Sequence, residues 1–218
     1  MRKPWHQIQG FSLPDVSSVS SFNQVGCPWS QFELGRLLTC EERLCAWVRQ
    51  PMNTYSNLAL FLAAIALYSQ GTRTQNGTLR DFGVLATLLG ISSSLGHASQ
   101  IRALVFLDYA SQFILFAYLI SFNWERLRGT TGSRWKRTLG LATLFAIPNL
   151  IDKRAGVVVF VLLTGLYLLS EYKGSLKRPA RSYAKLRSGL AIFAVAAICF
   201  GLDTSGVLCL PTRHLFQL

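Results

Sequence analysis

A serine, a histidine and an aspartate lie within sixteen residues of one another, at the ends of two apolar stretches. Ser93 and His97 are four residues apart, so they share one face of a helix. Asp108 follows a short polar break and stands near the start of the next apolar run. A hydroxyl, an imidazole and a carboxylate are suited to holding and activating a water molecule bound to a metal ion. The spacing therefore predicts a metal-dependent hydrolytic site where two helices meet.

The composition around these residues is that of a membrane protein. Half of the 218 residues are hydrophobic and 15% are charged, whereas about a quarter of the residues of a soluble domain are charged. Long apolar runs alternate with short basic loops, which is typical of a polytopic membrane protein. The net charge of +12 lies mainly in those loops. It therefore indicates contact with the lipid bilayer and argues against nucleic acid as a partner.

Six apolar stretches are long enough to cross a bilayer, so we expect an all-α bundle of transmembrane helices. We place them at 53–70, 82–97, 103–123, 136–151, 155–172 and 187–204. The second is the weakest span, because serines and His97 interrupt its last turns, and these are the functional candidates. Residues 1–50 are mixed in composition, so we expect an interfacial segment with one or two short amphipathic helices and no signal peptide. The transmembrane domain follows at 51–218.

The basic residues are unevenly distributed between the two sides of this bundle. The loops after the first, third and fifth spans hold 13 Lys and Arg residues, against 4 on the other side when the N-terminal segment is left out. Cytoplasmic loops carry the excess of positive charge, so the N-terminus is expected outside or in the lumen. His97, Asp108 and Asp203 then lie at one level near the outer surface, with Asp203 as a possible supporting residue.

The five cysteines show no zinc-finger or CxxC spacing. Cys27, Cys40, Cys45 and Cys209 map to the outer side, where a disulfide is permitted. The spacing leaves their pairing open. Cys199 is expected to be buried in the sixth span, and the odd number leaves at least one free thiol unless an intermolecular bond forms.

Three features taken together resemble the alkaline ceramidases, which belong to the CREST group of seven-span membrane hydrolases. The first is Cys40-Glu41-Glu42, followed by Pro51-Met52-Asn53-Thr54-Tyr55-Ser56-Asn57-Leu58 where the first span opens. The second is Ser93-x-x-x-His97 at the end of the second span. The third is Asp108, eleven residues after that histidine. The likeness covers about residues 38–210.

This resemblance implies a zinc-dependent amidase that hydrolyses the amide bond of ceramide or a related lipid to a sphingoid base and a fatty acid. In that family the zinc is held by the histidine of the S-x-x-x-H motif and by two histidines of an H-x-x-x-H motif on the seventh span. By this resemblance His97 is a zinc ligand. Ser93 stabilises the oxyanion or positions the water, and Asp108 orients or deprotonates it. Glu41 and Asn53 are possible supporting residues.

Two departures from the family pattern stand in the sequence. Neither a seventh span nor an H-x-x-x-H motif is present, and His214 is not assigned as a ligand, so we expect a fragment; a site completed by a partner and a degraded homologue are the alternatives. The family's calcium site is also altered. Glu41 matches one of its acids, but Leu38, Arg43 and Gln50 stand where the pattern has Asp, Asn and Glu. A calcium ion needs several oxygen ligands, so zinc is the expected cofactor and calcium is not.

Each candidate residue also has an ordinary structural explanation. His97 alone would be a polar residue at a helix end. Ser93 could bond to the carbonyl four residues earlier in its own helix, and Asp108 could pair with Arg102 at the membrane surface. Glu41 alone is typical of a solvated acid. The cluster Asn53, Thr54 and Ser56 after Pro51 indicates a helix N-cap with a secondary part in holding the site.

The leading hypothesis is a membrane-embedded lipid amidase, whose substrate rarely leaves the bilayer. The alternative, from a different class, is a non-catalytic homologue that binds lipid or partners and lacks the full metal site. An unrelated six-span carrier is disfavoured, because the polar residues gather at one surface and no inverted repeat is evident. The sequence leaves the oligomeric state and the particular membrane open.

Overall fold

The computed structural model describes residues 26–35, 41, 43–129, 132–151 and 155–176, and positions 188, 191, 194–196, 198–199 and 201–202. In these ranges the chain is all-α, as expected, and one isolated bridge is its only extended pairing. The helices are α1 (Pro51–Ser56), α2 (Leu58–Arg73), α3 (Gly77–Ser99), α4 (Arg102–Arg128), α5 (Arg134–Ile151) and α6 (Ala155–Ser175).

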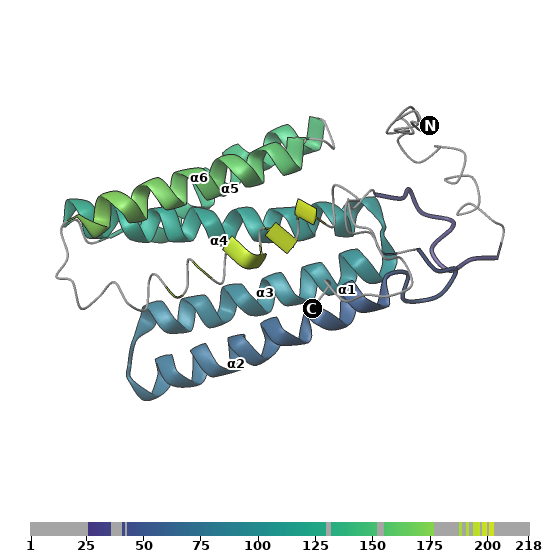
Figure 1. Ribbon diagram of the computed structural model, residues 1–218, viewed down its shortest axis with the longest axis horizontal. Coiled ribbons are helices and arrows are strands. Elements are labelled where there is room, and N and C mark those ends of the chain that lie inside the picture. The colour runs from purple at the N-terminus through teal and green to yellow at the C-terminus, as the bar shows by residue number, and fades with distance from the viewer. Residues whose placement is uncertain are drawn as a thin grey trace, which may run out of the picture.

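The longest helix, α4, lies at the centre of the described bundle (Figure 1). It packs against α3 on one side and against α5 and α6 on the other, while α1 and α2 pack on α3. The apolar core lies between α4 and α6, where Phe113 and Phe116 contact Val159 and Leu163. The candidate residues on α3 and α4 therefore lie on the two helices that join the halves of the bundle.

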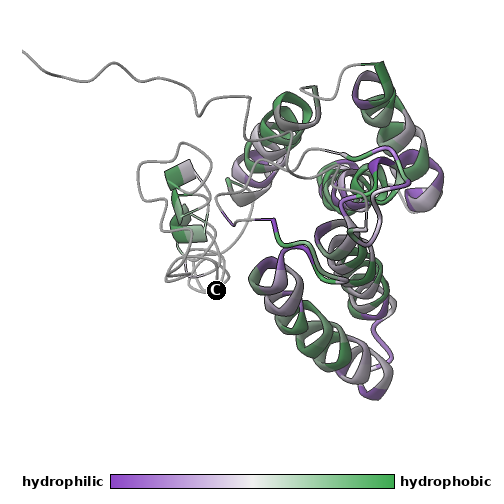
Figure 2. Cartoon of the chain, turned by 90° about the vertical axis from the view of Figure 1, so that its right-hand side faces the viewer, coloured by the Kyte–Doolittle hydropathy of each residue, from purple (hydrophilic) through white to green (hydrophobic). Residues whose placement is uncertain are grey.

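Among the helices that the structure describes, two, α3 and α4, are long and apolar enough to cross a membrane. Hydrophobic residues run along the helices (Figure 2), and many large apolar side chains face outward. Leu62 on α2, Leu144 on α5 and Val161 on α6 are each at least 60% exposed. An apolar exterior of this kind is stable against lipid and costly against water.

Five of the six expected spans coincide with helices, but their bounds move. The first is divided, because α1 ends at Ser56 and α2 begins at Leu58. The expected loop 71–81 shrinks to a short turn, since the Asn76 side chain accepts a hydrogen bond from the Leu79 N–H and caps α3. The second span, the weakest in sequence, is therefore a full helix of 23 residues. Half of the sixth expected span lies outside the described residues, and its described positions are helical.

The expected amphipathic helices of the N-terminal segment are not found where it is described. Residues 26–35 and 43–50 form turns and bends, and tertiary contacts hold them in place. Leu34 bridges Ile101, the Gly35 N–H donates to the Gln100 carbonyl at 2.7 Å, and the Arg102 N–H donates to the Glu33 carbonyl at 2.8 Å. These bonds replace the internal hydrogen bonds that a helix would have made.

The cysteine expectations are met in part. Cys27 and Cys45 form a disulfide, which is one of the pairings that the sequence left open. Cys199 carries a free thiol and is only partly buried, so the expectation that it is buried is wrong. Cys40 and Cys209 lie outside the described residues.

One close contact between α2 and α3 depends on the absence of a side chain at Gly83. A Cβ atom there would lie 2.9 Å from the Tyr68 backbone nitrogen and 3.0 Å from the Ala64 carbonyl oxygen. Gly140 in α5 meets nothing within 4 Å, which makes it a matched control.

We predict that Gly83→Ala lowers the free energy of unfolding by about 2 kcal/mol, because the two backbones must separate. Gly140→Ala should raise it by about 0.5 kcal/mol or more through helix propensity. Denaturant titration of the detergent-purified variants, followed by helical circular dichroism, measures both. Equal effects of the two substitutions would contradict the packing described here.

Candidate functional site

The carboxylate of Asp108 lies between α3 and α4 and is 2% exposed. It accepts a hydrogen bond from Gln112 Nε2 at 3.2 Å on its own helix, and the side chain of Ser93 on α3 lies beside it. Gly96 permits this approach, since a Cβ there would lie only 3.3 Å from the Asp108 Cβ. The carboxylate therefore packs against the turn of α3 that leads to His97.

Two adjacent serines on α3 have different partners. Ser92 Oγ lies 2.9 Å from the Leu88 carbonyl oxygen and 2.7 Å from Ser111 Oγ on α4. Ser111 in turn donates to the Asp108 carbonyl at 2.7 Å. The bond to the carbonyl four residues earlier is thus made by Ser92, whereas Ser93 contacts the carboxylate of Asp108. The structural explanation considered for Ser93 applies to its neighbour.

The imidazole of His97 is oriented by Gln50, a residue from outside the long helices. His97 Nδ1 lies 2.8 Å from Gln50 Oε1, and Gln50 Nε2 donates to the Glu41 carbonyl at 3.3 Å. Because the amide nitrogen is used in that bond, the amide oxygen faces the ring and Nδ1 carries the proton. Nε2 then holds the lone pair, which is the arrangement of a histidine prepared to bind a metal ion.

Gln50 itself is completely buried and was not among the expected site residues. In the resemblance to the ceramidases, Gln50 stands only as the replacement of an acid. Its neighbour Arg49 helps to fix it, because the Arg49 N–H donates to the Ala98 carbonyl at 2.8 Å and Arg49 Nη2 donates to the Pro28 carbonyl at 2.9 Å. Burial lowers the pKa of the Arg49 guanidinium. The backbone bond to Ala98 holds Gln50 beside His97.

Glu41 caps helix α1 and is not a solvated acid. It is 3% exposed, and its carboxylate accepts from the Met52 N–H at 2.8 Å, the Asn53 N–H at 2.9 Å and Asn53 Nδ2 at 2.7 Å. A carboxylate at the first turn of a helix satisfies free N–H groups and interacts well with the helix dipole. Both oxygens of Glu41 are engaged in this way, so it supports the site through the backbone that carries Gln50.

The N-cap role expected for the cluster after Pro51 is wrong. Thr54 Oγ1 and Ser56 Oγ donate to carbonyls of their own helix, at 2.6 and 2.9 Å, and the N-cap residue Gln50 makes no side-chain cap bond. Asn53 instead contacts Glu41. Glu41 is ten residues away from the first residue of α1, and capping by so distant an acid leaves no local sequence signal. The residues after Pro51 were therefore wrongly predicted to be the cap.

Asp108 does not pair with Arg102. Arg102 Nη1 donates to Glu33 Oε1 at 2.6 Å, in an ion pair whose side chains are 48% and 61% exposed. The charged side chains of Arg102 and Asp108 at the start of α4 therefore point in different directions. Asp108 faces α3, and Arg102 faces the N-terminal segment.

In the described residues Ser93 lies beside Asp108, whereas the ring of His97, one turn further along α3, contacts Gln50. The described residues contain no group of three or more His, Cys, Asp or Glu side chains arranged to hold a metal ion. His97 alone therefore contributes a nitrogen donor from the part of the chain described, and a catalytic zinc needs about three protein ligands. Asp203 and His214 lie outside that part.

No family model, curated protein or solved structure matches this chain. The chemical argument therefore depends on the geometry. The lone pair on His97 Nε2 can occupy one coordination position of a metal ion. The buried carboxylate can accept a proton, and the hydroxyl can donate one hydrogen bond.

We predict that Glu41→Ala lowers the free energy of unfolding by about 2–4 kcal/mol, because buried N–H groups of α1 lose their acceptor. Glu33→Ala is the control, since an exposed ion pair contributes less than about 1 kcal/mol. Denaturant titration in detergent compares the two. A loss at Glu41 no larger than that at Glu33 would contradict the capping role.

Proposed function

We propose that this chain is a multi-pass integral membrane amidase that uses zinc to hydrolyse the amide bond of ceramide or a related lipid. The observation that supports the proposal is the position of Ser93 beside the buried Asp108 carboxylate, one turn before His97, whose Nδ1 contacts Gln50 and whose Nε2 is the lone-pair nitrogen. These are also the residues whose spacing resembles the alkaline ceramidases. The products would be a sphingoid base and a fatty acid.

Zinc, when bound, supplies a water of lowered pKa and polarises the carbonyl of the amide. His97 would provide one ligand through Nε2, and the remaining ligands would come from outside the described residues. Asp108 accepts the proton of the attacking water, and its burial beside Gln112 keeps the carboxylate in one orientation. Once Asp108 has taken that proton, the single O–H of Ser93 is released from the carboxylate and donates toward the oxygen that gains negative charge. Asp203 is retained as a possible supporting residue.

The membrane setting is part of the proposal. The two long apolar helices α3 and α4 and the exposed apolar faces of the others support several spans. With the N-terminus outside or in the lumen, His97 near the end of α3 and Asp108 near the start of α4 lie close to the outer surface. The amide group of a ceramide lies at such an interfacial depth, between its chains and the water. The substrate can therefore approach from within the bilayer.

We predict about one zinc per chain in the detergent-purified protein, and loss of that zinc in His97→Ala. Asp108→Asn and Ser93→Ala should keep the metal and lower kcat for a fluorescent ceramide by about 100-fold or more, since each removes a group that acts in the transition state. Elemental analysis and a fatty-acid release assay measure the two effects.

Ser92→Ala is the matched control for Ser93→Ala, because Ser92 lies one position away and contacts Ser111 in place of Asp108. It should leave kcat within about threefold of the parent, since it changes packing and not the reacting groups. Parent protein that binds no zinc and releases no fatty acid would overturn the amidase proposal. That result would favour the non-catalytic, lipid-binding homologue.

The role of Gln50 gives a separate prediction. Gln50→Leu should weaken zinc binding about 10–100-fold, because residues that orient a ligating histidine commonly contribute that much. Gln112→Leu, which removes a partner of Asp108, should leave zinc affinity unchanged and lower kcat. Competition with a chelator of known affinity measures the first effect. Equal zinc affinity in the two variants would contradict the assignment of Gln50.

A further inference from the structure

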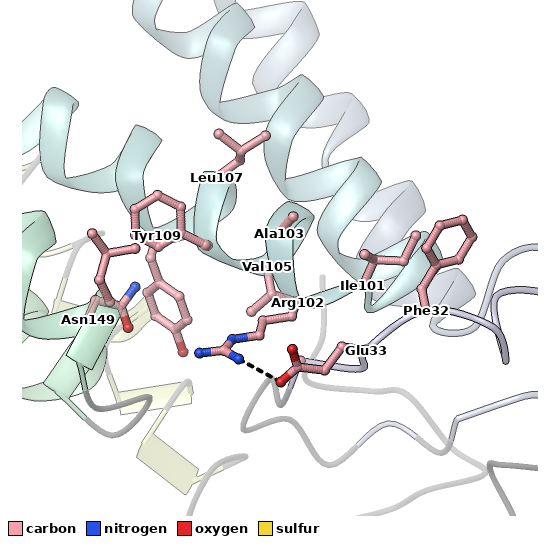
Figure 3. Close-up of a pocket in the computed structure, with 12 residues that line it drawn as sticks. Phe32, Glu33, Ile101, Arg102, Ala103, Val105, Leu107, Tyr109 and Asn149 are labelled. Carbon is pink, nitrogen blue, oxygen red and sulfur yellow. Dashed lines mark hydrogen bonds and ion pairs between the residues drawn. The ribbon is translucent and has the colours of Figure 1, made fainter.

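A pocket of about 600 Å³ opens on the side of α4 away from α3. Its walls come from three segments that are far apart in the sequence: Phe32–Gly35, the first two turns of α4, and Asn149 with Leu150 at the end of α5. Figure 3 shows Phe32 at one end of the pocket, Tyr109 and Asn149 at the other, and the Arg102–Glu33 ion pair between them. The pocket is therefore amphipathic.

The walls are fixed by backbone contacts. Glu33 and Gly35 are bonded to Arg102 and Gln100 through main-chain hydrogen bonds of 2.8 and 2.7 Å. Gly35 packs so closely on α4 that a Cβ there would lie 2.8 Å from a methyl carbon of Val105. A pocket whose walls are held in this way exists before a ligand arrives, which lowers the entropy cost of binding.

The polar groups of the pocket carry both signs of charge. Arg102 uses Nη1 in the bond to Glu33, and a guanidinium has further N–H donors suited to a phosphate. Glu33 contributes a carboxylate to the lining, and the rings of Phe32, Phe106 and Tyr109 also line the pocket. A carboxylate with aromatic faces is the environment that recognises a quaternary or primary ammonium. Leu107 and Leu150 provide the apolar surface beyond.

We propose that this pocket binds a zwitterionic phospholipid of the bilayer, with its phosphate on Arg102, its ammonium group at Glu33 and the aromatic rings, and an acyl chain along Leu107 and Leu150. An anionic headgroup without an ammonium would leave Glu33 facing the phosphate. A neutral diacylglycerol would leave both charges without a ligand partner. The ion pair therefore selects the lipid that carries the complementary pair of charges.

The lipid in this pocket is separate from the hydrolysed one, so the inference does not depend on the proposed activity. Asp108 faces α3 and lies beside Ser93, whereas its neighbours Leu107 and Tyr109 line the pocket. The two sites thus lie on different faces of α4. A phospholipid held here would join the N-terminal segment to α5.

Photolabelling of the detergent-purified full chain tests the proposal. Three probes with the same diazirine-bearing acyl chain are used one at a time: phosphatidylcholine, phosphatidylglycerol and diacylglycerol. Peptide mass spectrometry should find phosphatidylcholine on the 106–109 segment and Leu150 at about ten times the yield of the other two, since one charge-assisted contact corresponds to about tenfold in affinity. Unlabelled phosphatidylcholine should compete.

Two variants make the test specific. Arg102→Gln removes the phosphate partner and should lower pocket labelling by phosphatidylcholine about tenfold. Leu107→Trp fills the apolar part and should lower it as well. Leu88→Trp is the control, because Leu88 is similarly exposed, 43% against 50% for Leu107, and lines a different groove between α2 and α3. Equal labelling by the three lipids, or labelling that Leu107→Trp leaves unchanged, would show surrounding lipid only and overturn the proposal.

Discussion

The carboxylate of Asp108, buried between two helices, sets the register of the bundle. A charge in apolar surroundings is costly unless it is hydrogen-bonded, so α3 must present Ser93 as a partner and Gly96 as space. The contact between Ser92 and Ser111 lies beside it and requires the same register. A change of register would move Gly96 away from Asp108 and bring a residue with a side chain into the space that Gly96 leaves. The need to accommodate the Asp108 carboxylate thus determines both the packing of α3 on α4 and the shape of the candidate site.

A second constraint comes from the segment that precedes the long helices. Glu41 fixes the first turn of α1, and the backbone bond from Arg49 to Ala98 fixes Gln50 against the end of α3. The disulfide between Cys27 and Cys45 closes the loop that contains Glu41. The imidazole of His97 is therefore oriented by a chain of contacts that begins some fifty residues earlier. This explains why so polar a segment is well packed in its described part.

Apolar length and periodicity were sufficient to predict the helices, because burial of apolar surface decides where they form. The helix boundaries could not be predicted in the same way, because Asn76 extends α3 by side-chain capping and a break at Asn57 separates α1 from α2. The meeting of Ser93 with Asp108 was predictable from helical spacing and a short turn between helices. The roles of Gln50 and Glu41 were not, because they depend on contacts between distant segments. The ion pair between Arg102 and Glu33 could not be predicted either, because these residues are far apart in the sequence.

The partners of Asp108 are close to it in the chain. Ser93 and Gln112 belong to α3 and α4, which are joined by a turn at Gln100 and Ile101. Two adjacent helices that enter a bilayer during synthesis can therefore satisfy this carboxylate as a hairpin, before α5 and α6 exist. The polar group that would otherwise resist transfer into lipid instead favours insertion of the two helices as a unit. The carboxylate that the proposed reaction would use thus also suits the order in which the helices are made.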